Sequence, residues 1–517
     1  MQPETISLEE TDCFSKTFTD YLAGKEELNP YYSLKPKLES FKTAIGAKAF
    51  SQKKRNQLFS ALSRQYQGLD VTAGVAQNIE ALKKEKTFTI TTGHQLNIFT
   101  GPLYFLYKII TVINACKELK KKYPEYTFVP VYWMASEDHD FEEISYFYFE
   151  GKKVQWDTPQ TGAVGRFSPN GLLEITNSLP SGSSFFADAY NQESLSKAVR
   201  HYVNHLFGNE GIVVIDADDA ELKRSLIPVI KDDLFAHTPE KLVSKSSQEL
   251  HTLGHKTQVT AREVNFFYLR EDVRERIERT KEGFKVVNTE LSFSEDELKK
   301  LVNSHPEHFS PNVILRPLYQ EIILPNLAYV GGPSELIYWL QLKGVFDHFD
   351  EAFPILMPRN FGLVCPEKHK IKWEEMGLSK VDLFKEHNRV LTKWINANSK
   401  NKISYKEEID QLRQIEKASK SKANLVDPTL SQHLEAIHAT FTKKLQKAEK
   451  KIMRAEKRKH EEKGKQIEAI RDVLFPNGVL QERRENFLNF YLKDPTFVQK
   501  LMDAFDPFNY QMYLLYE

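Results

Sequence analysis

This chain has few cysteines, no long apolar run and no excess of either charge. The three cysteines, Cys13, Cys116 and Cys365, lie far apart without a CxxC pair, which indicates neither a disulfide framework nor a zinc knuckle and fits a reducing compartment. No run reaches the roughly 18 apolar residues that a membrane span needs. Basic and acidic residues number 71 each, so no global field attracts nucleic acid.

The start of the chain and its overall composition are those of a folded soluble protein. The first twelve residues, MQPETISLEETD, are polar and acidic, whereas a secretory signal is basic and then apolar. A length of 517 residues exceeds one ordinary domain and allows a large core with insertions. We therefore expect a cytoplasmic protein of several structural units that binds neither nucleic acid nor a membrane.

Short β-branched and aromatic runs follow the polar, helix-prone residues 1–85. They are apolar almost throughout, as in strands covered on both faces of a parallel sheet, and they lie at residues 87–92, 127–135, 211–215 and 353–358. A helix is expected from Pro102, because proline suits the first turn of a helix. The alternation predicts an open α/β sheet, in which ligands bind beyond the carboxyl ends of the strands.

Two long stretches, 146–208 and 239–312, interrupt this alternation, and we interpret both as insertions. The sheet domain then consists of residues 1–145, which include an N-terminal wrap, together with 209–238 and 313–377. Residues 378–480 are rich in lysine and glutamate and predict a helical coiled-coil hairpin that turns at 424–428. Residues 481–517 are expected to form a helical tail that packs on the core.

The second arm of the hairpin carries an apolar stripe at spacings of three and four, with Leu434, Ile437, Phe441, Leu445, Ala448, Ile452 and Ala455 as its members. The stripe packs on the first arm alone, or also on a second copy of the chain, and we favour the homodimer. The basic run at 443–465 is interpreted as the solvated face of a coiled coil rather than a nucleic-acid site.

The loop after the first core strand contains Gly93, His94, Gln95 and Asn97. Glycine lets the backbone approach a ligand closely, and the start of the following helix favours phosphate or carboxylate. A ligand loop is one interpretation. A well-capped turn with a structural histidine is the other.

Three carboxylates and an imidazole, Glu137, Asp138, His139 and Asp140, follow the second core strand. Close carboxylates repel one another unless a cation, a hydrogen-bond network or a positively charged substrate balances them. Glu137 or Asp138 would meet a substrate ammonium, and His139 would transfer protons near neutral pH. A metal site that also uses His94 is the alternative, but no HExxH or other recognised ligand spacing is present, and we assign no metal ligand.

Tandem glycines before a further helix predict a cradle for an anionic or nucleotide group, with a tight turn as the alternative. Arg316 would clamp a carboxylate in bidentate fashion or form a buried ion pair, and Arg359 reaches what we expect to be the same rim. The residues assigned to substrate binding in these segments are Arg316, Gly331, Gly332, Ser334, Glu335, Arg359 and Asn360.

The end of the chain is unusually aromatic, and an exposed tail of that kind is an apolar liability. We expect hydrophobic anchoring of the tail on the body of the protein. The alternative is an adenine site in which Phe384, His387, Tyr510 and Tyr513 surround a flat ring. No GxxxxGK[ST], GxGxxG or GxSxG motif supports a standard kinase, dehydrogenase or serine hydrolase.

Four ordered blocks, TTGHQLNIFTGPLYFLYKI, WMASEDHDFEEI, RPLYQEIILPNLAYVGGPSEL and PRNF, resemble the cysteine ligases of bacillithiol biosynthesis, and the likeness covers nearly the whole chain. The resemblance implies a Rossmann-like core related to class I aminoacyl-tRNA synthetases, two connecting-peptide insertions and a coiled coil used in dimerisation. It also implies that the carboxyl group of L-cysteine condenses with the amine of glucosaminyl malate, with ATP activating the carboxylate. A role for Mg²⁺ stays open.

Residue chemistry suggests roles within this scheme. His94 would stabilise an anionic acyl intermediate, the 137–139 segment would orient and deprotonate the amine, and Arg316 or Arg359 would read the malate. Gly331, Gly332 and Ser334 would contact the second ligand. A nucleotide-binding dimeric scaffold and a tRNA-binding synthetase relative are the alternatives. Neutral charge and the lack of a KMSKS-like signature count against the tRNA-binding relative, and the crowded carboxylates count against the scaffold.

Overall fold

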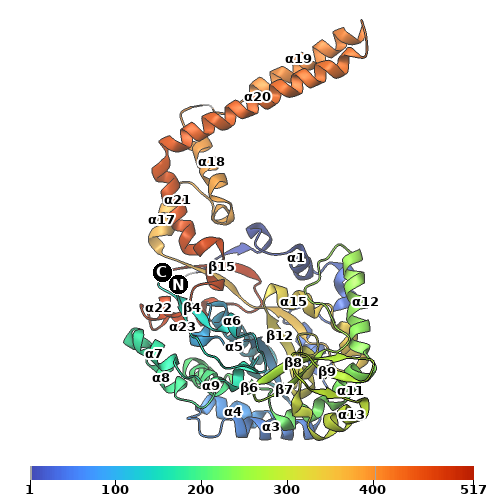
Figure 1. The fold of residues 1–517 in the computed structure, drawn as a ribbon. Helices are drawn as coiled ribbons and strands as arrows, with labels where there is room; N and C mark the ends of the chain where they lie inside the picture. The colour runs from blue at the N-terminus through green and yellow to red at the C-terminus, as the bar shows by residue number, and fades with distance from the viewer. Residues whose placement is uncertain (1–2, 402) are drawn as a thin grey trace. The chain divides into compact units, whose positions relative to one another are not determined.

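The computed structural model describes residues 3–401 and 403–517, which divide into two units (Figure 1). Unit 1 is formed by the chain up to Leu363 together with Leu480–Leu515. Unit 2 is formed by Val364–Val479 and the last two residues. Nowhere in the described residues is a helix both long and apolar enough to cross a lipid bilayer.

A five-stranded parallel sheet forms the core of unit 1. Its order is β13 (Ile355–Pro358), β12 (Asn326–Gly331), β2 (Thr87–His94), β3 (Thr127–Met134) and β6 (Val213–Asp216). All eight residues of β2 are buried, as expected of a strand with helices on both faces. The sheet confirms the predicted α/β class and its four predicted strands, and adds β12.

The strand order creates a switch point in the middle of this sheet. The chain steps outward from β2 to β3 and β6, and then returns to place β12 and β13 on the other side of β2. Ligands of open α/β sheets bind in the crevice that such a reversal leaves at the carboxyl ends. The crevice here lies between β2 and β12, and α5 (Tyr104–Lys122), the helix predicted from Pro102, packs against both strands.

The stretch 146–208 folds as a β-hairpin followed by helices. The elements are β4 (Tyr146–Phe149), β5 (Lys152–Gln155), α7 (Leu172–Ser178), α8 (Phe185–Tyr190) and α9 (Leu195–Phe207). The stretch 239–312 supplies most of α12 (Thr238–Thr252), then α13 (Glu295–Ser304) and an antiparallel sheet of β10 (Ser292–Phe293), β9 (Phe284–Val286), β8 (Val273–Arg279), β7 (Phe266–Arg270) and β11 (Phe309–Pro311). Within the described chain, none of these strands joins the parallel sheet.

Shorter helices complete unit 1. Before the sheet lie α1 (Lys16–Ala23), α2 (Ser40–Ala47), α3 (Gln52–Gln65) and α4 (Ala73–Ala81). Between the strands lie α6 (Phe141–Ile144), α10 (Ala220–Lys223), α11 (Ile227–Phe235), α14 (Arg316–Ile323), α15 (Pro333–Trp339) and α16 (Lys343–His348). Phe41 of α2 joins Phe88 of β2 and Val112 of α5 in a hydrophobic core.

The C-terminal segment returns to unit 1 through α22 (Leu488–Tyr491) and α23 (Phe497–Ala504), and α23 packs on α5. Its last residues form β15 (Gln511–Tyr516), which pairs antiparallel with β1 (Pro3–Ser7) in a sheet that also contains β14 (Phe361–Cys365). The expectation of a wholly helical tail is therefore wrong at its end, because the apolar run QMYLLY pairs with a strand.

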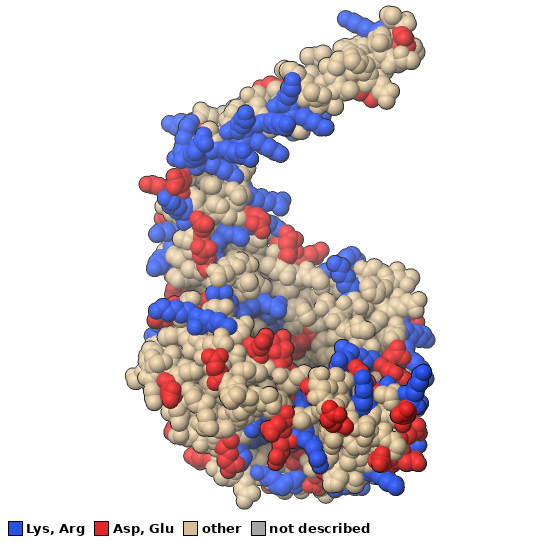
Figure 2. All heavy atoms as spheres, in the orientation of Figure 1, with Lys and Arg blue, Asp and Glu red and all other residues tan. Residues whose placement is uncertain are grey.

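Unit 2 is helical, with α17 (Glu367–Glu375), α18 (His387–Asn398), α19 (Lys406–Asn424), α20 (Leu430–Lys459) and α21 (Glu461–Leu474). The hairpin of α19 and α20 turns where the sequence predicted, and the two arms lie side by side (Figure 1). The second arm is not one helix, because His460 interrupts it with φ −109° and ψ 29°. Lys and Arg side chains gather along part of the hairpin, whereas its tip has few (Figure 2).

Candidate functional site

Polar and aromatic side chains gather at the carboxyl ends of β2 and β12, where the strand order predicts a ligand crevice. Gly93 lies at the end of β2, where an added Cβ would be 3.3 Å from the Tyr329 hydroxyl and 3.6 Å from Arg316 Nη1. A Cβ would press on the Tyr329 hydroxyl, whereas its distance from Arg316 Nη1 is an ordinary van der Waals contact. Glycine therefore lets the Tyr329 hydroxyl approach the end of β2 closely.

A buried lysine from α5, Lys108, connects the end of β2 to the start of α15. Lys108 Nζ donates to the Gly93 carbonyl at 2.7 Å and pairs with Glu335 Oε1 at 2.6 Å. The Tyr329 hydroxyl donates to the other Glu335 oxygen at 2.6 Å. Burial lowers the pKa of Lys108, and the Glu335 carboxylate opposes that shift. Glu335, which we expected to bind substrate, is thus already paired with a protein cation.

The Arg316 guanidinium is surrounded by the rings of Trp133, Tyr329 and Trp339, at 5.7, 5.5 and 6.0 Å from their centroids. Its Nη1 donates to Gln320 at 3.1 Å. Its buried Nη2 makes no hydrogen bond of good geometry among residues 3–401 and 403–517, although the guanidinium also interacts with the Tyr338 hydroxyl. A buried N–H without an acceptor costs about 1–3 kcal/mol, so this edge of Arg316 is suited to a ligand acceptor.

His94 ends β2 and is only 8% exposed. Its ring packs against Tyr104 and Phe105, both at 5.2 Å between centroids. No described residue accepts from or donates to its buried Nε2. Burial, and then the positive charges of Lys108 and Arg359, hold the pKa of His94 well below its usual range. His94 is therefore neutral near pH 7 and acts through a hydrogen bond rather than as a cation.

Arg359 follows β13 and forms a buried ion pair. Its two terminal nitrogens donate to the two oxygens of Glu482 at 2.6 and 3.1 Å, and the side chains are 3% and 1% exposed. Asn360 bonds to Thr111 and to the Asp506 carbonyl. Both terminal nitrogens of Arg359 are therefore bonded to Glu482. Of the two arginines predicted to bind malate, only Arg316 has a terminal nitrogen without a hydrogen bond of good geometry in the described residues.

The tandem glycines have different surroundings. Gly331 lies against Leu336 and Tyr329, whereas Gly332 donates its N–H to Glu335 Oε1 at 3.2 Å and lies 4.0 Å, measured from an ideal Cβ, from Arg359 Nε. That Nε is buried and lacks a partner in the described chain. Ser334 is exposed.

The loops after β2 and β3 meet, as their predicted positions on neighbouring strands require. Gln95 Nε2 donates to Asp138 Oδ2 at 3.1 Å and to Glu143 at 2.6 Å. Asn97 donates to the Glu143 carbonyl, and its buried Oδ1 has no described partner. Asp140 caps α6 through the Glu143 N–H. Asp138 is 31% exposed, accepts from the His139 N–H at 2.8 Å and lies 3.8 Å from Arg274 Nη1. Asp140 is also exposed.

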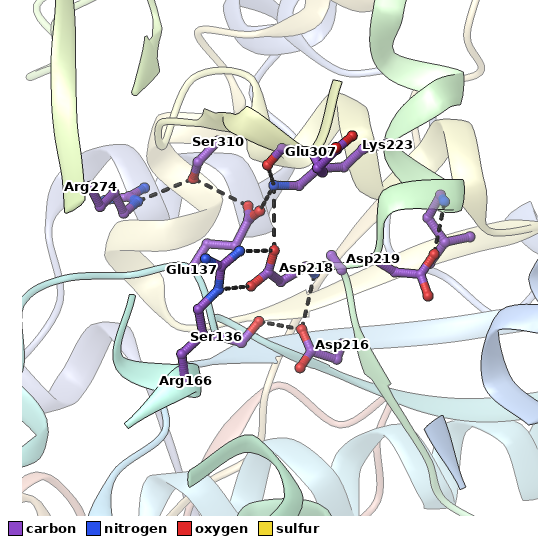
Figure 3. Close-up of polar contacts among 12 residues, drawn as sticks. Ser136, Glu137, Arg166, Asp216, Asp218, Asp219, Lys223, Arg274, Glu307 and Ser310 are labelled. Carbon is purple, nitrogen blue, oxygen red and sulfur yellow. Dashed lines mark hydrogen bonds and ion pairs between the residues drawn. The ribbon is translucent and has the colours of Figure 1, made fainter. Parts of the chain in front are cut away.

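Glu137 belongs to a buried ion-pair cluster, which we define as Glu137, Arg166, Asp218, Lys223 and Arg274 (Figure 3). Lys223, fully buried, contacts Glu137 and lies 3.7 Å from Asp218. Arg166 donates two hydrogen bonds to Asp218 at 2.7 and 3.0 Å. Burial raises the pKa of Glu137 although Lys223 opposes the shift. The protein's own cations thus balance the carboxylate that we expected to meet a substrate ammonium.

Arg274 connects this cluster to His139. Its Nη1 lies 2.6 Å from His139 Nδ1, and its Nε donates to Ser310, which donates to Glu137 at 3.2 Å. Arginine only donates, so Nδ1 accepts and a neutral His139 carries its proton on Nε2. Burial and the Arg274 charge lower the pKa of His139. His139 therefore has no free basic nitrogen in this arrangement, contrary to its predicted role as a base.

The four aromatic residues of the predicted adenine site lie in two units. In unit 1, Tyr510 donates to the Pro36 carbonyl at 2.7 Å, and Tyr513 packs on Phe505 at 5.2 Å. In unit 2, Phe384 packs on Phe475, and His387 Nε2 lies 3.1 Å from the Gly464 carbonyl. Tyr510 and Tyr513 thus contact the body of unit 1, as anchoring of the tail predicts. The adenine site stays a prediction.

Sequence reasoning missed Lys108, Tyr329 and Glu482. Lys108 carried a usable signal, because it is the one charged residue in the apolar run PLYFLYKIITVINA. A lysine in such a helix is buried at a cost unless it is paired. Tyr329 stood within a quoted block but without a role. Glu482 had no signal, because it lies among other charged residues.

The comparisons with known proteins agree with this architecture. Residues 1–360 match the family model "Bacillithiol biosynthesis BshC, N-terminal Rossmann-like domain", and residues 362–517 match its "C-terminal coiled-coil domain". Proteins named "Putative cysteine ligase BshC" from Flavobacterium psychrophilum and Cytophaga hutchinsonii are 43% and 41% identical, each over 98% of both chains. One from Flavobacterium johnsoniae is 43% identical over 97% of this chain and 98% of its own. The chain therefore belongs to the bacillithiol biosynthesis BshC family.

Proposed function

We propose that this chain is a cytoplasmic cysteine ligase that joins the carboxyl group of L-cysteine to the amine of glucosaminyl malate, with ATP activating the carboxylate. The names of its relatives support the ligase role. The observation that carries the proposal is a pair of buried, unpartnered polar atoms at the crevice, Arg316 Nη2 and His94 Nε2, neither of which is satisfied within the described chain.

Arg316 binds a carboxylate of the malate group. Its aromatic surroundings fix the plane of the guanidinium, and a fixed fork loses little entropy when it pairs with a carboxylate. Lys108 adds positive charge but is neutralised locally by Glu335. The net preference of the crevice is therefore for an anion, as a dicarboxylic substrate requires.

His94 and Asp138 act on the reacting groups. The neutral His94 ring donates from Nε2 to the oxygen on which negative charge develops when the amine attacks. Asp138 holds the glucosamine nitrogen and accepts its proton, because Glu137 is paired with Lys223 and His139 Nδ1 is occupied by Arg274. Gln95, bonded to Asp138 at 3.1 Å, positions that carboxylate.

ATP supplies a leaving group that makes amide formation in water favourable. Its adenine is assigned to the aromatic residues near the chain end, where Tyr510 is half-buried. Calorimetry with ADP tests this assignment: Tyr510→Ala weakens binding several-fold if the ring stacks on adenine, and unchanged affinity in the folded variant removes Tyr510 from the site. Tyr513→Phe, which keeps the ring, is the matched control.

The direct test is incubation of the purified protein with glucosaminyl malate, cysteine and ATP, with mass spectrometry of the thiol product and chromatography of AMP and ADP. Serine in place of cysteine is the control for substrate choice. Product that requires ATP supports the ligase. Nucleotide binding without product favours the dimeric scaffold, and aminoacylation of tRNA favours the synthetase relative.

A second copy of the chain is proposed to cover the apolar side chains that the hairpin leaves exposed. Ile415 of α19 and Ile437 and Phe441 of α20 are 56%, 50% and 53% exposed. Ile437 and Phe441 belong to the apolar stripe of the second arm, and exposed apolar patches mark interaction surfaces. The helical spacing of the stripe fits the packing of one coiled coil on another.

A further inference from the structure

A short turn in the second stretch of unit 1 gathers three metal-binding side chains. His305 is the C-cap residue of α13, and the turn Pro306–His308 leads into β11. One ligand atom each from His305, Glu307 and His308 lies within 4.8 Å of the other two. These residues belong to the antiparallel-sheet subdomain and take no part in the crevice described above.

The two histidines are held face to face. Their rings are stacked at 5.1 Å between centroids and 15° between planes. His305 Nδ1 lies 2.9 Å from Glu307 Oε1. His308 Nδ1 is buried, and no partner for it exists in the described part of the chain. A buried ring nitrogen without a partner is a cost that a bound ion removes.

We propose that His305, Glu307 and His308 form a binding site for a divalent transition metal ion of the zinc class. Two imidazoles and one carboxylate are a common three-ligand set for zinc, with water in the fourth position. Ligands about 2.1 Å from a tetrahedral ion lie roughly 3.4 Å apart. The ligand atoms here are all within 4.8 Å of one another, and a bound ion would replace the His305–Glu307 hydrogen bond.

The turn also supports the buried ion-pair cluster. The Glu307 carbonyl accepts from Lys223 Nζ at 3.1 Å, as Figure 3 shows. Ser310, in the strand that follows the turn, donates to Glu137. A metal ion on the side chains of the turn would fix the backbone that positions Lys223 and Glu137, and so has a structural role.

The test is titration of the full-length protein, free of any histidine tag and stripped with EDTA, with Zn²⁺ in a calorimeter. Co²⁺ is added separately as a spectroscopic probe. We expect one equivalent of Zn²⁺ per chain, a visible Co²⁺ absorption band and a rise in Tm with Zn²⁺. His305→Ala and His308→Ala each weaken binding at least tenfold and abolish the band. His251→Ala, at an exposed histidine on α12, leaves both unchanged.

Two results would overturn the proposal. The first is no saturable binding of Zn²⁺ by the folded wild-type protein in the calorimeter. The second is binding that survives in the double variant His305→Ala, His308→Ala but is lost in Glu27→Gln. That outcome would place the ion at the other described group with suitable ligands, Asp20, Glu27 and His255.

Discussion

Arg359 and Glu482 are joined by two hydrogen bonds across 123 residues of sequence, with both side chains almost completely buried. Removing one partner leaves the other charge buried and uncompensated, which costs about 3–5 kcal/mol. We expect Glu482→Gln to lower the free energy of unfolding by that amount in urea denaturation. The double variant Arg359→Met, Glu482→Leu should lose much less, and an equal loss in both would show that packing rather than charge is responsible.

Arg316→Lys should weaken substrate binding more than it slows chemistry. Lysine keeps the charge but loses the planar fork, and a hydrogen bond to a charged group contributes about 1.5–3 kcal/mol. We expect KM for glucosaminyl malate to rise roughly 10- to 100-fold, with kcat changed much less. Arg262→Lys, at an exposed arginine, is the control. A fall in kcat at constant KM would contradict malate recognition by Arg316.

His94→Gln should reduce kcat about 10²- to 10³-fold, the cost of losing one donor to a developing oxyanion. Glutamine fills part of the space between Tyr104 and Phe105, so Tm should change little. Steady-state kinetics and thermal melting measure the two effects. Full activity in a folded variant would remove His94 from the mechanism.

The depressed pKa of His94 also predicts how stability depends on pH. The unfolded state takes up a proton near pH 6.5, whereas the folded state resists it. The contribution of His94 to the free energy of unfolding is therefore complete above pH 6.5. It declines as the pH falls from 6.5 towards the pKa of His94 in the folded state. Wild type should lose more stability than His94→Gln between pH 7 and 5, measured by urea denaturation, and parallel curves would contradict the shift.

Substitution of Asp138 should affect catalysis, whereas substitution of Lys223 should affect stability. Asp138→Asn is expected to abolish product formation with Tm nearly unchanged, because its side chain is partly exposed in a loop. Lys223→Met removes the cation that Glu137 and Asp218 share, and it should lower the free energy of unfolding by about 3–5 kcal/mol. Activity assays and urea denaturation of both variants measure product formation and stability separately. A stable, inactive Lys223→Met would instead assign Lys223 to the chemistry.

The homodimer depends on the apolar stripe of the hairpin. Ile437→Lys combined with Phe441→Lys places two charges on that stripe and should give a monomer in light scattering at micromolar concentration. Ile371→Lys changes a comparably exposed residue of α17, 49% exposed, and should leave the dimer intact. A wild-type protein that is already monomeric would contradict the proposal.

The sequence predicted the core sheet well because its strands are buried on both faces and contain little except apolar and β-branched residues. It also placed the loops after β2 and β3 beside each other, and Gln95 and Asp138 do meet there. It could not tell that Glu137 is neutralised, because its partners Lys223 and Arg274 come from distant segments. Charged pairs of this kind depend on tertiary contacts that local patterns do not encode.

The pairing of β1 with β15 bears on how the protein is made. Pro3 lies opposite Leu515, so β1 can pair only after the far more C-terminal β15 has been synthesised. Unit 1 is also interrupted in sequence by Val364–Val479, which form most of unit 2. Contacts between such distant residues close slowly, and an unpaired edge strand is open to wrong pairing in the meantime. Expression yield should therefore respond to chaperones that shield the N-terminal segment during synthesis.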